Sequence, residues 1–94
     1  MPLGIISLHL QIPGCTSLKE KRGRLKPLMA RLHREFNISV AEMDHHDAWQ
    51  ESLIACAMVS NDTSFTTRSL QAIPHWIEVH YPDVVVLDNK IEII

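Results

Sequence analysis

The hydrophobic pattern predicts a β-strand over residues 3–12, because apolar and polar residues alternate from residue 6 onward. The two alternating sets are Ile6, Leu8, Leu10 and Ile12 on one face and Ser7, His9 and Gln11 on the other. Pro13 and Gly14 follow directly, and this pair interrupts regular structure. We therefore expect a strand with one buried face that ends before residue 13.

Between residues 17 and 36 the hydrophobic period lengthens to that of a helix. The apolar stripe consists of Leu18, Leu25, Met29, Leu32 and Phe36. Thr16 and Ser17 precede it, and their hydroxyls are good acceptors for the unpaired N–H groups of a first helical turn. Pro27 removes one N–H inside the helix and presses its ring against the carbonyl of Gly23, so we expect a kink there.

Two further strands are predicted, at residues 38–43 and 49–59, with a polar connection at residues 44–48. The second of them is apolar on both faces: Leu53, Ala55, Ala57 and Val59 alternate with Ile54, Cys56 and Met58. A strand of this composition is covered on both faces.

A second helix is predicted from the turn at residues 60–62 to about Tyr81, with another kink at Pro74. Its inward residues are Leu70, Ile73 and Ile77. Residues 84–94 form either one last strand or a hairpin bent around Asp88 and Asn89, and the sequence leaves this open because no glycine marks a tight turn.

The predicted order is strand, helix, strand, strand, helix, strand. Two strand–helix–strand crossovers joined by a hairpin predict an α+β fold, the ferredoxin-like split β-α-β-β-α-β sandwich. In this fold a four-stranded antiparallel sheet carries both helices on one face. The chain of 94 residues has neither repeat nor linker, so we expect residues 1–94 to form a single ferredoxin-like domain.

Composition indicates a cytoplasmic protein without a membrane partner. Hydrophobic residues make up 46% of the chain, yet no apolar run reaches the length of a membrane span. No basic region precedes the first apolar stretch, as a secretory signal would require. The two cysteines, Cys15 and Cys56, form no motif of a disulfide-rich protein, which suits a reducing compartment.

Basic residues are concentrated in the first predicted helix. Residues 17–36 hold seven of the nine Lys and Arg residues and only two acidic residues, so this segment carries +5 and the rest of the chain −7. Such a helix suits RNA or another polyanion, and binding of this kind weakens with salt. The candidate polyanion-binding residues are Lys19, Lys21, Arg22, Arg24 and Lys26. The alternative is a solvated helix face with ion pairs at four-residue spacing, namely Glu20–Arg24 and Arg31–Glu35.

The densest group of potential metal ligands is Asp44-His45-His46-Asp47 in the predicted hairpin connection. Imidazole and carboxylate suit zinc, but adjacent residues rarely converge on one ion, and no motif such as H-E-x-x-H accompanies them. A polar hairpin loop is the favoured interpretation, and a small metal- or small-molecule-binding enzyme is the alternative. Cys15 lies just before a basic helix, but no base is assigned to it. The sequence therefore assigns no catalytic residue, metal site or cofactor.

The helix-free face of the sheet is expected to carry Ser7, His9, Gln11, Ala55 and Ala57. RNA-binding sheets of this fold display aromatic side chains for base stacking, and none is placed centrally on a predicted strand here. A flat face of small residues instead suits contact with a second copy, so we expect a homo-oligomer through this face. The opposite register of the third strand, with Ile54 and Met58 outward, remains open.

Four collinear segments resemble the YlxP-like family of small bacterial proteins, domain of unknown function 503. They are S-L-K-E-K-R at residues 17–22, F-N-I-S-V-A-E at residues 36–42, the residues Asp44, His45, Asp47, Trp49 and Gln50, and V-S-N-D at residues 59–62. The resemblance implies a ferredoxin-like fold and a homo-oligomer, but no established activity. Members are often encoded beside translation and ribosome-maturation factors, which implies a ribosome-associated partner.

Carried over by position, the family's motif residues are Lys19, Lys21 and Arg22 on the helix and a hairpin cluster of Glu42, Asp44, His45, Asp47 and Trp49. Gly23, Pro27, His46 and Ala48 depart from the family pattern. Together, residues and resemblance favour a non-enzymatic, homo-oligomeric accessory protein whose basic first helix binds RNA or another polyanion near the translation machinery.

Overall fold

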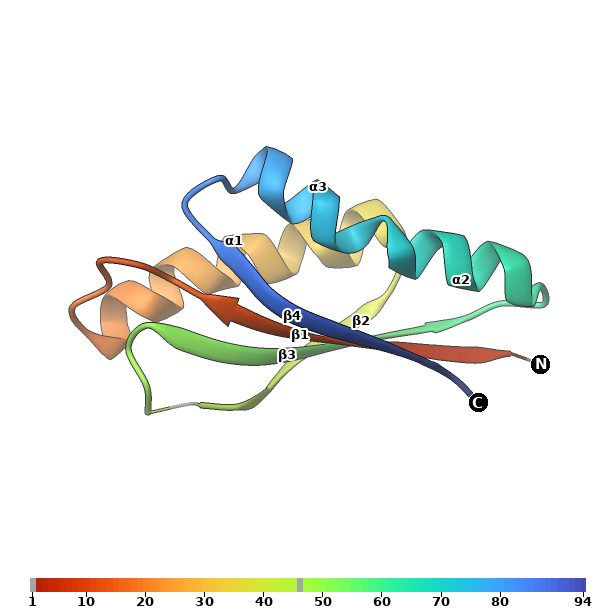
Figure 1. Cartoon of the computed structure of the whole chain (residues 1–94), viewed down its shortest axis with the longest axis horizontal. Helices are drawn as coiled ribbons and strands as arrows, with labels where there is room; N and C mark the ends of the chain where they lie inside the picture. The colour runs from red at the N-terminus through yellow and green to blue at the C-terminus, as the bar shows by residue number, and fades with distance from the viewer. Residues whose placement is uncertain (1, 46) are drawn as a thin grey trace.

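Four antiparallel strands form one sheet, and all the helices lie on one side of it (Figure 1). The computed structural model describes residues 2–45 and 47–94. The elements are β1 (Leu3–Gln11), α1 (Leu18–Phe36), β2 (Ser39–Asp44), β3 (Glu51–Val59), α2 (Thr63–Gln71), α3 (Ile73–His80) and β4 (Val85–Ile93). The sheet order β2-β3-β1-β4 is that of the ferredoxin-like sandwich, so the predicted α+β fold is confirmed.

The central strands β1 and β3 bury alternate residues against the helices. Leu8 pairs with Ile54 and Ile6 with Cys56, and all four side chains are inaccessible to solvent. Ala55 pairs with Ser7 and therefore lies on the opposite, helix-free face. This settles the register that the sequence left open, with Ile54, Cys56 and Met58 beneath the helices.

Helix α1 begins with a reciprocal cap. The Ser17 hydroxyl accepts from the Glu20 N–H at 3.1 Å, and the Glu20 carboxylate accepts from the N–H and hydroxyl of Thr16, each at 3.0 Å. The helix extends over 19 residues and includes Pro27, which lies on its exposed side together with Gly23, four residues earlier. No helix in the described part of the chain is long and apolar enough to cross a bilayer.

The buried face of α1 differs from the predicted stripe. It consists of Lys21, Leu25, Leu28 and Leu32, whereas Leu18 and Met29 are only half-buried. The prediction was wrong at Lys21 because a basic residue was assumed to face water. The spacing of these four positions is the regular helical one.

The C-terminal half also departs from the predicted elements. The predicted second helix is two short helices, separated at Ala72, and Pro74 stands in the first turn of α3, where its missing N–H costs nothing. Residues of β4 form one nine-residue strand rather than a bent hairpin. Its register against β1 shifts between His9 and Leu10, which accommodates one extra residue.

Two glycines allow a matched test of the packing. At Gly4 on β1, an added Cβ would lie 2.5 Å from Thr66 Cγ2 and 2.8 Å from Leu70 Cδ1, so α2 packs directly on the strand backbone. Around Gly23, on the exposed side of α1, an added Cβ meets nothing within 4 Å. The same substitution therefore has opposite consequences at the two positions.

We predict that Gly4→Ala lowers the free energy of unfolding by about 1–3 kcal/mol, because the methyl overpacks the α2 contact. Gly23→Ala should raise it by about 0.5–1 kcal/mol, because alanine loses less backbone entropy in a helix. Urea denaturation followed by circular dichroism measures both. Equal effects at the two positions would contradict the packing described here.

Candidate functional site

The outward face of α1 carries a row of basic side chains. Lys19, Arg22 and Lys26 recur at spacings of three and four residues and are exposed, and Arg34 is exposed further along the helix. Among the described residues, none of these four forms an ion pair. They constitute the free basic surface of the molecule, defined here as Lys19, Arg22, Lys26 and Arg34.

Two other cations of α1 are occupied by contacts within the protein. Arg24 bonds to the Asp83 carboxylate at 2.8 Å and to the Pro13 carbonyl at 3.0 Å, which joins the two loops at this end of the sheet. Arg31 lies over the ring of Trp76, 5.1 Å from its centroid. Arg24 is therefore engaged in packing rather than presented as a free cation.

The predicted ion pairs at four-residue spacing are absent from the described part of the chain. Glu20 instead accepts hydrogen bonds from Thr16, first from its backbone N–H and then from its hydroxyl, and these lower the pKa of its carboxyl. The charge of Arg24 contributes least to that shift. The alternative of a solvated helix face is thus wrong in its two predicted ion pairs, although the outer side of α1 is exposed.

Lys21, which the sequence placed in the polyanion set, is buried with 1% of its surface exposed. Its Nζ lies 3.0 Å from Glu42 Oε2 and donates to the His45 carbonyl at 2.5 Å. The same Glu42 oxygen accepts from the Ser52 hydroxyl at 2.6 Å. The ammonium therefore fastens the first turns of α1 to the β2–β3 hairpin and is withdrawn from the surface, so its assignment to polyanion binding was wrong.

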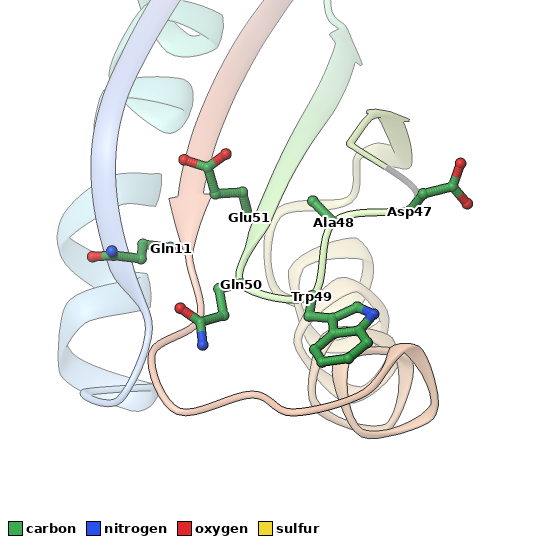
Figure 2. Close-up of a pocket in the computed structure, with 6 residues that line it drawn as sticks. All are labelled: Gln11, Asp47, Ala48, Trp49, Gln50 and Glu51. Atoms are coloured by element: carbon green, nitrogen blue, oxygen red, sulfur yellow. The ribbon is translucent and has the colours of Figure 1, made fainter.

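The five residues of the predicted hairpin cluster do not converge on one point. Glu42 faces Lys21, while the Asp44 carboxylate accepts from the His45 N–H at 2.7 Å. Figure 2 shows the Asp47 carboxylate directed away from Trp49, whose side chain is 53% exposed. His46, the third residue of the run Asp44–Asp47, lies outside the described residues.

A shallow hollow of about 510 Å³ opens beside this loop (Figure 2). It is lined by Gln11, Asp47, Ala48, Trp49, Gln50 and Glu51. Gln11 and Glu51 are partners across the β1–β3 ladder, and the others belong to the hairpin connection. The hollow offers amides, carboxylates and one exposed indole, but no nucleophile–base pair.

The structure brings together a group that the sequence did not indicate. The rings of His9 and His45 stack with centroids 5.5 Å apart, and His9 Nε2 lies 3.6 Å from Glu51 Oε1. His9 is paired with Leu53 in the ladder, so Glu51 is its diagonal neighbour on the same face. The antiparallel register would have revealed the His9–Glu51 pair, but the approach of His45 depends on the hairpin bend.

Neither cysteine is accessible for chemistry. Both are free and buried, and the Cys15 thiol donates to the Ser17 carbonyl at 3.6 Å. Burial raises the pKa of the Cys56 thiol to about 12, which disfavours the reactive thiolate.

The helix-free face has an apolar end and a polar end. At the first half of β2 and the last half of β3, a depression of about 210 Å³ is lined by Ile5, Ser39, Val40, Ala41, Ala55 and Ala57. His9 of β1 and Glu51 of β3 lie toward the other end of the β1–β3 ladder.

We predict that Lys21→Met destabilises the protein by about 3 kcal/mol, since it removes the cation that neutralises a partly buried Glu42 carboxylate. Lys21→Met combined with Glu42→Gln should recover part of this loss, because no uncompensated charge then remains. Denaturation by urea measures each variant. Lys19→Met, two residues earlier and exposed, is the matched control and should change stability by less than about 0.5 kcal/mol; an equal loss there would contradict the role of the buried pair.

Comparison with known proteins places these features in a family. The model of the family described as "Protein of unknown function (DUF503)" matches residues 3–91. The uncharacterized protein YlxP of Bacillus subtilis (strain 168) is 35% identical over 82 residues, which cover 87% of this chain and 88% of that protein. Buried Lys21 and Glu42, the hairpin and the basic helix all lie within the matched range. The chain therefore belongs to the DUF503 family, as its motifs indicated, and the function of that family is uncharacterised.

Proposed function

We propose that the protein is a non-enzymatic accessory protein of the cytoplasm that binds RNA through the free basic surface of α1. The observation that carries this proposal is a row of exposed cations, Lys19, Arg22 and Lys26, which form no ion pair within residues 2–45 and 47–94, on a chain whose net charge is −2. When the rest of a protein is neutral or acidic, its one basic helix attracts a polyanion and orients it toward that helix. With a rise of about 1.5 Å per residue, the row from Lys19 to Arg34 extends over roughly 22 Å.

The binding mode is recognition of the phosphate backbone. Lys and Arg side chains on a helix contact phosphates without reading base sequence. The helix-free face supplies no Phe, Tyr or Trp at the centre of its described strands, so it lacks the stacking platform of RNA-recognition sheets. The complex is therefore tolerant of sequence and sensitive to salt. The choice of a ribosome-associated RNA as partner rests on what the resemblance to the family implies, not on this chemistry.

A matched pair of double variants tests this proposal. Arg22→Ala/Lys26→Ala removes two cations from the free basic surface, and Arg68→Ala/Lys90→Ala removes two from elsewhere. The two variants have the same net charge. In the unmodified protein, Arg68 bonds to the Ser64 carbonyl and Lys90 pairs with Glu92.

We expect the α1 double variant to bind structured RNA more weakly and to lower the slope of log K against log salt concentration by about 1.5. The control double variant should retain most of both quantities. Fluorescence anisotropy of a labelled RNA hairpin over a range of KCl concentrations measures them. Equal losses in the two variants, or no salt-sensitive binding by the unmodified protein at low ionic strength, would overturn the proposal.

We further propose that the protein forms a homo-oligomer through the apolar end of the helix-free face. Ile5, Ala55 and Ala57 line a depression there, and every second residue of β3 up to Ala57 is half-buried although no helix covers it. Small side chains let two sheets approach closely. An isologous pairing of this face with itself leaves α1 outward on both copies.

We predict that Ala57→Glu converts the oligomer into a monomer, because two carboxylates would meet at the apolar contact. Ala30→Glu makes the same change on the exposed side of α1 and should leave the oligomer intact. Sedimentation velocity at several protein concentrations distinguishes the states. A monomeric unmodified protein at every concentration would refute the proposed contact.

A further inference from the structure

We propose that His9, His45 and Glu51 bind one divalent transition-metal ion of the zinc class on the helix-free face. Each residue offers one donor atom, and the three donors lie within 4.8 Å of one another. This site is separate from the free basic surface and from the apolar end of the sheet. It is also distinct from the sequence run Asp44–Asp47, of which it uses only His45.

The first support is an unsatisfied donor atom. His9 Nε2 is buried and makes no hydrogen bond in the described structure, and the carboxylate oxygen Glu51 Oε1 stands 3.6 Å away. A buried polar atom without a partner is unusual, and a metal ion provides the missing electron-pair acceptor. Two ligands at about 2.1 Å from a tetrahedral zinc ion lie roughly 3.4 Å apart, which is close to the observed separation of this pair.

The second support is that the scaffold holds all three residues. His9 and Glu51 project from adjacent paired strands, whose ladder fixes their separation. His45 has a left-handed backbone with φ of 62°, and its carbonyl accepts from both the buried Lys21 ammonium and the Ala48 N–H. The strand ladder thus positions His9 and Glu51, and hydrogen bonds to its carbonyl hold His45 in the connection beside them, so the imidazoles need only modest rotation to reach a common ion.

The local charge favours a cation. A small depression of about 70 Å³ beside His9 is also lined by Asp88, the ladder partner of His9 on β4, and Asp44 adjoins His45. Lys90 also lines that depression, but its ammonium is 3.2 Å from the Glu92 carboxylate. The charge of Lys21 is balanced by Glu42. Carboxylates are therefore in excess around the three donors.

The donor set selects the class of ion. Two imidazoles and one carboxylate are ligands of zinc and its first-row neighbours, whereas calcium and magnesium prefer oxygen alone. Three protein ligands leave a coordination position that water or a further donor fills. The site lies on the helix-free face, where the His9 side chain is 33% exposed, away from the apolar end proposed for self-association.

Titration of the untagged, chelator-treated protein with Zn²⁺ by calorimetry tests the proposal. We expect one Zn²⁺ ion to bind per chain. Co²⁺ bound in its place should give a visible d–d spectrum, which reports on the imidazole ligands. His9→Ala and Glu51→Gln should each weaken Zn²⁺ binding by about tenfold or more, because a ligand is lost. His75→Ala and Glu78→Gln remove the same groups from exposed positions of α3 and should leave the affinity unchanged.

Thermal unfolding provides a second readout, since an ion that binds only the folded chain raises its Tm. His45→Ala, in the loop, serves if His9→Ala does not fold, and it should abolish the Zn²⁺-dependent shift of Tm relative to its own metal-free form. Absence of stoichiometric Zn²⁺ binding would overturn the proposal. Binding that is equally strong in the His9, His45 and Glu51 variants would overturn it as well, by placing the ion elsewhere.

Discussion

The buried contact between Lys21 and Glu42 is the interaction on which the arrangement of the surface depends. An ammonium and a carboxylate 3.0 Å apart, with a carbonyl and a hydroxyl as further partners, form a satisfied polar group inside the molecule. It ties the start of α1 to the middle of β2 and to the hairpin connection. Burial of one charge without the other would be costly, so these segments are held in a single relative position.

That contact also decides which cations reach solvent. Three of the basic residues of α1 are directed into the protein: Lys21 toward Glu42, Arg24 toward Asp83 and Arg31 toward Trp76. The remaining residues stand on the outer face without ion pairs in the described chain. The charge excess of the helix is therefore smaller at the surface than its composition indicates, but it is concentrated along one line.

The sheet separates the surfaces that the proposals use. Its covered face supplies the core, and α1 lies over that face with the free basic surface turned away from it. The open face has small apolar residues around Ala57 and titratable residues around His9. These two groups lie at opposite ends of the paired strands β1 and β3. The surfaces proposed for polyanion binding, self-association and metal binding are therefore different surfaces of one small molecule, and the last two leave α1 exposed.

Local physical chemistry was sufficient for most of the fold. Alternation in β1, the cap at Ser17 and the order of elements depend on neighbouring residues, so the sequence alone determined the α+β sandwich and the family. Pro74 was harder to place, because its effect depends on whether it begins a helix or interrupts one. The predicted apolar stripe of α1 differs from its observed buried face because Lys21 was taken to be a surface residue. Yet the spacing of Lys21 with Leu25, Leu28 and Leu32 is regular for one helix face.

Only the tertiary structure decided which charged side chains are buried or paired within the protein. It also decided which side chains from distant segments contact one another. Lys21 is 24 residues from His45, and Arg24 is 59 residues from Asp83, so no local pattern reports either contact. His9 reaches Glu51 through strand register and His45 through the bend of a hairpin. Sequence patterns report the period of an element and the face it buries, whereas the partner of a polar side chain is set by the packing of elements that are distant in the chain.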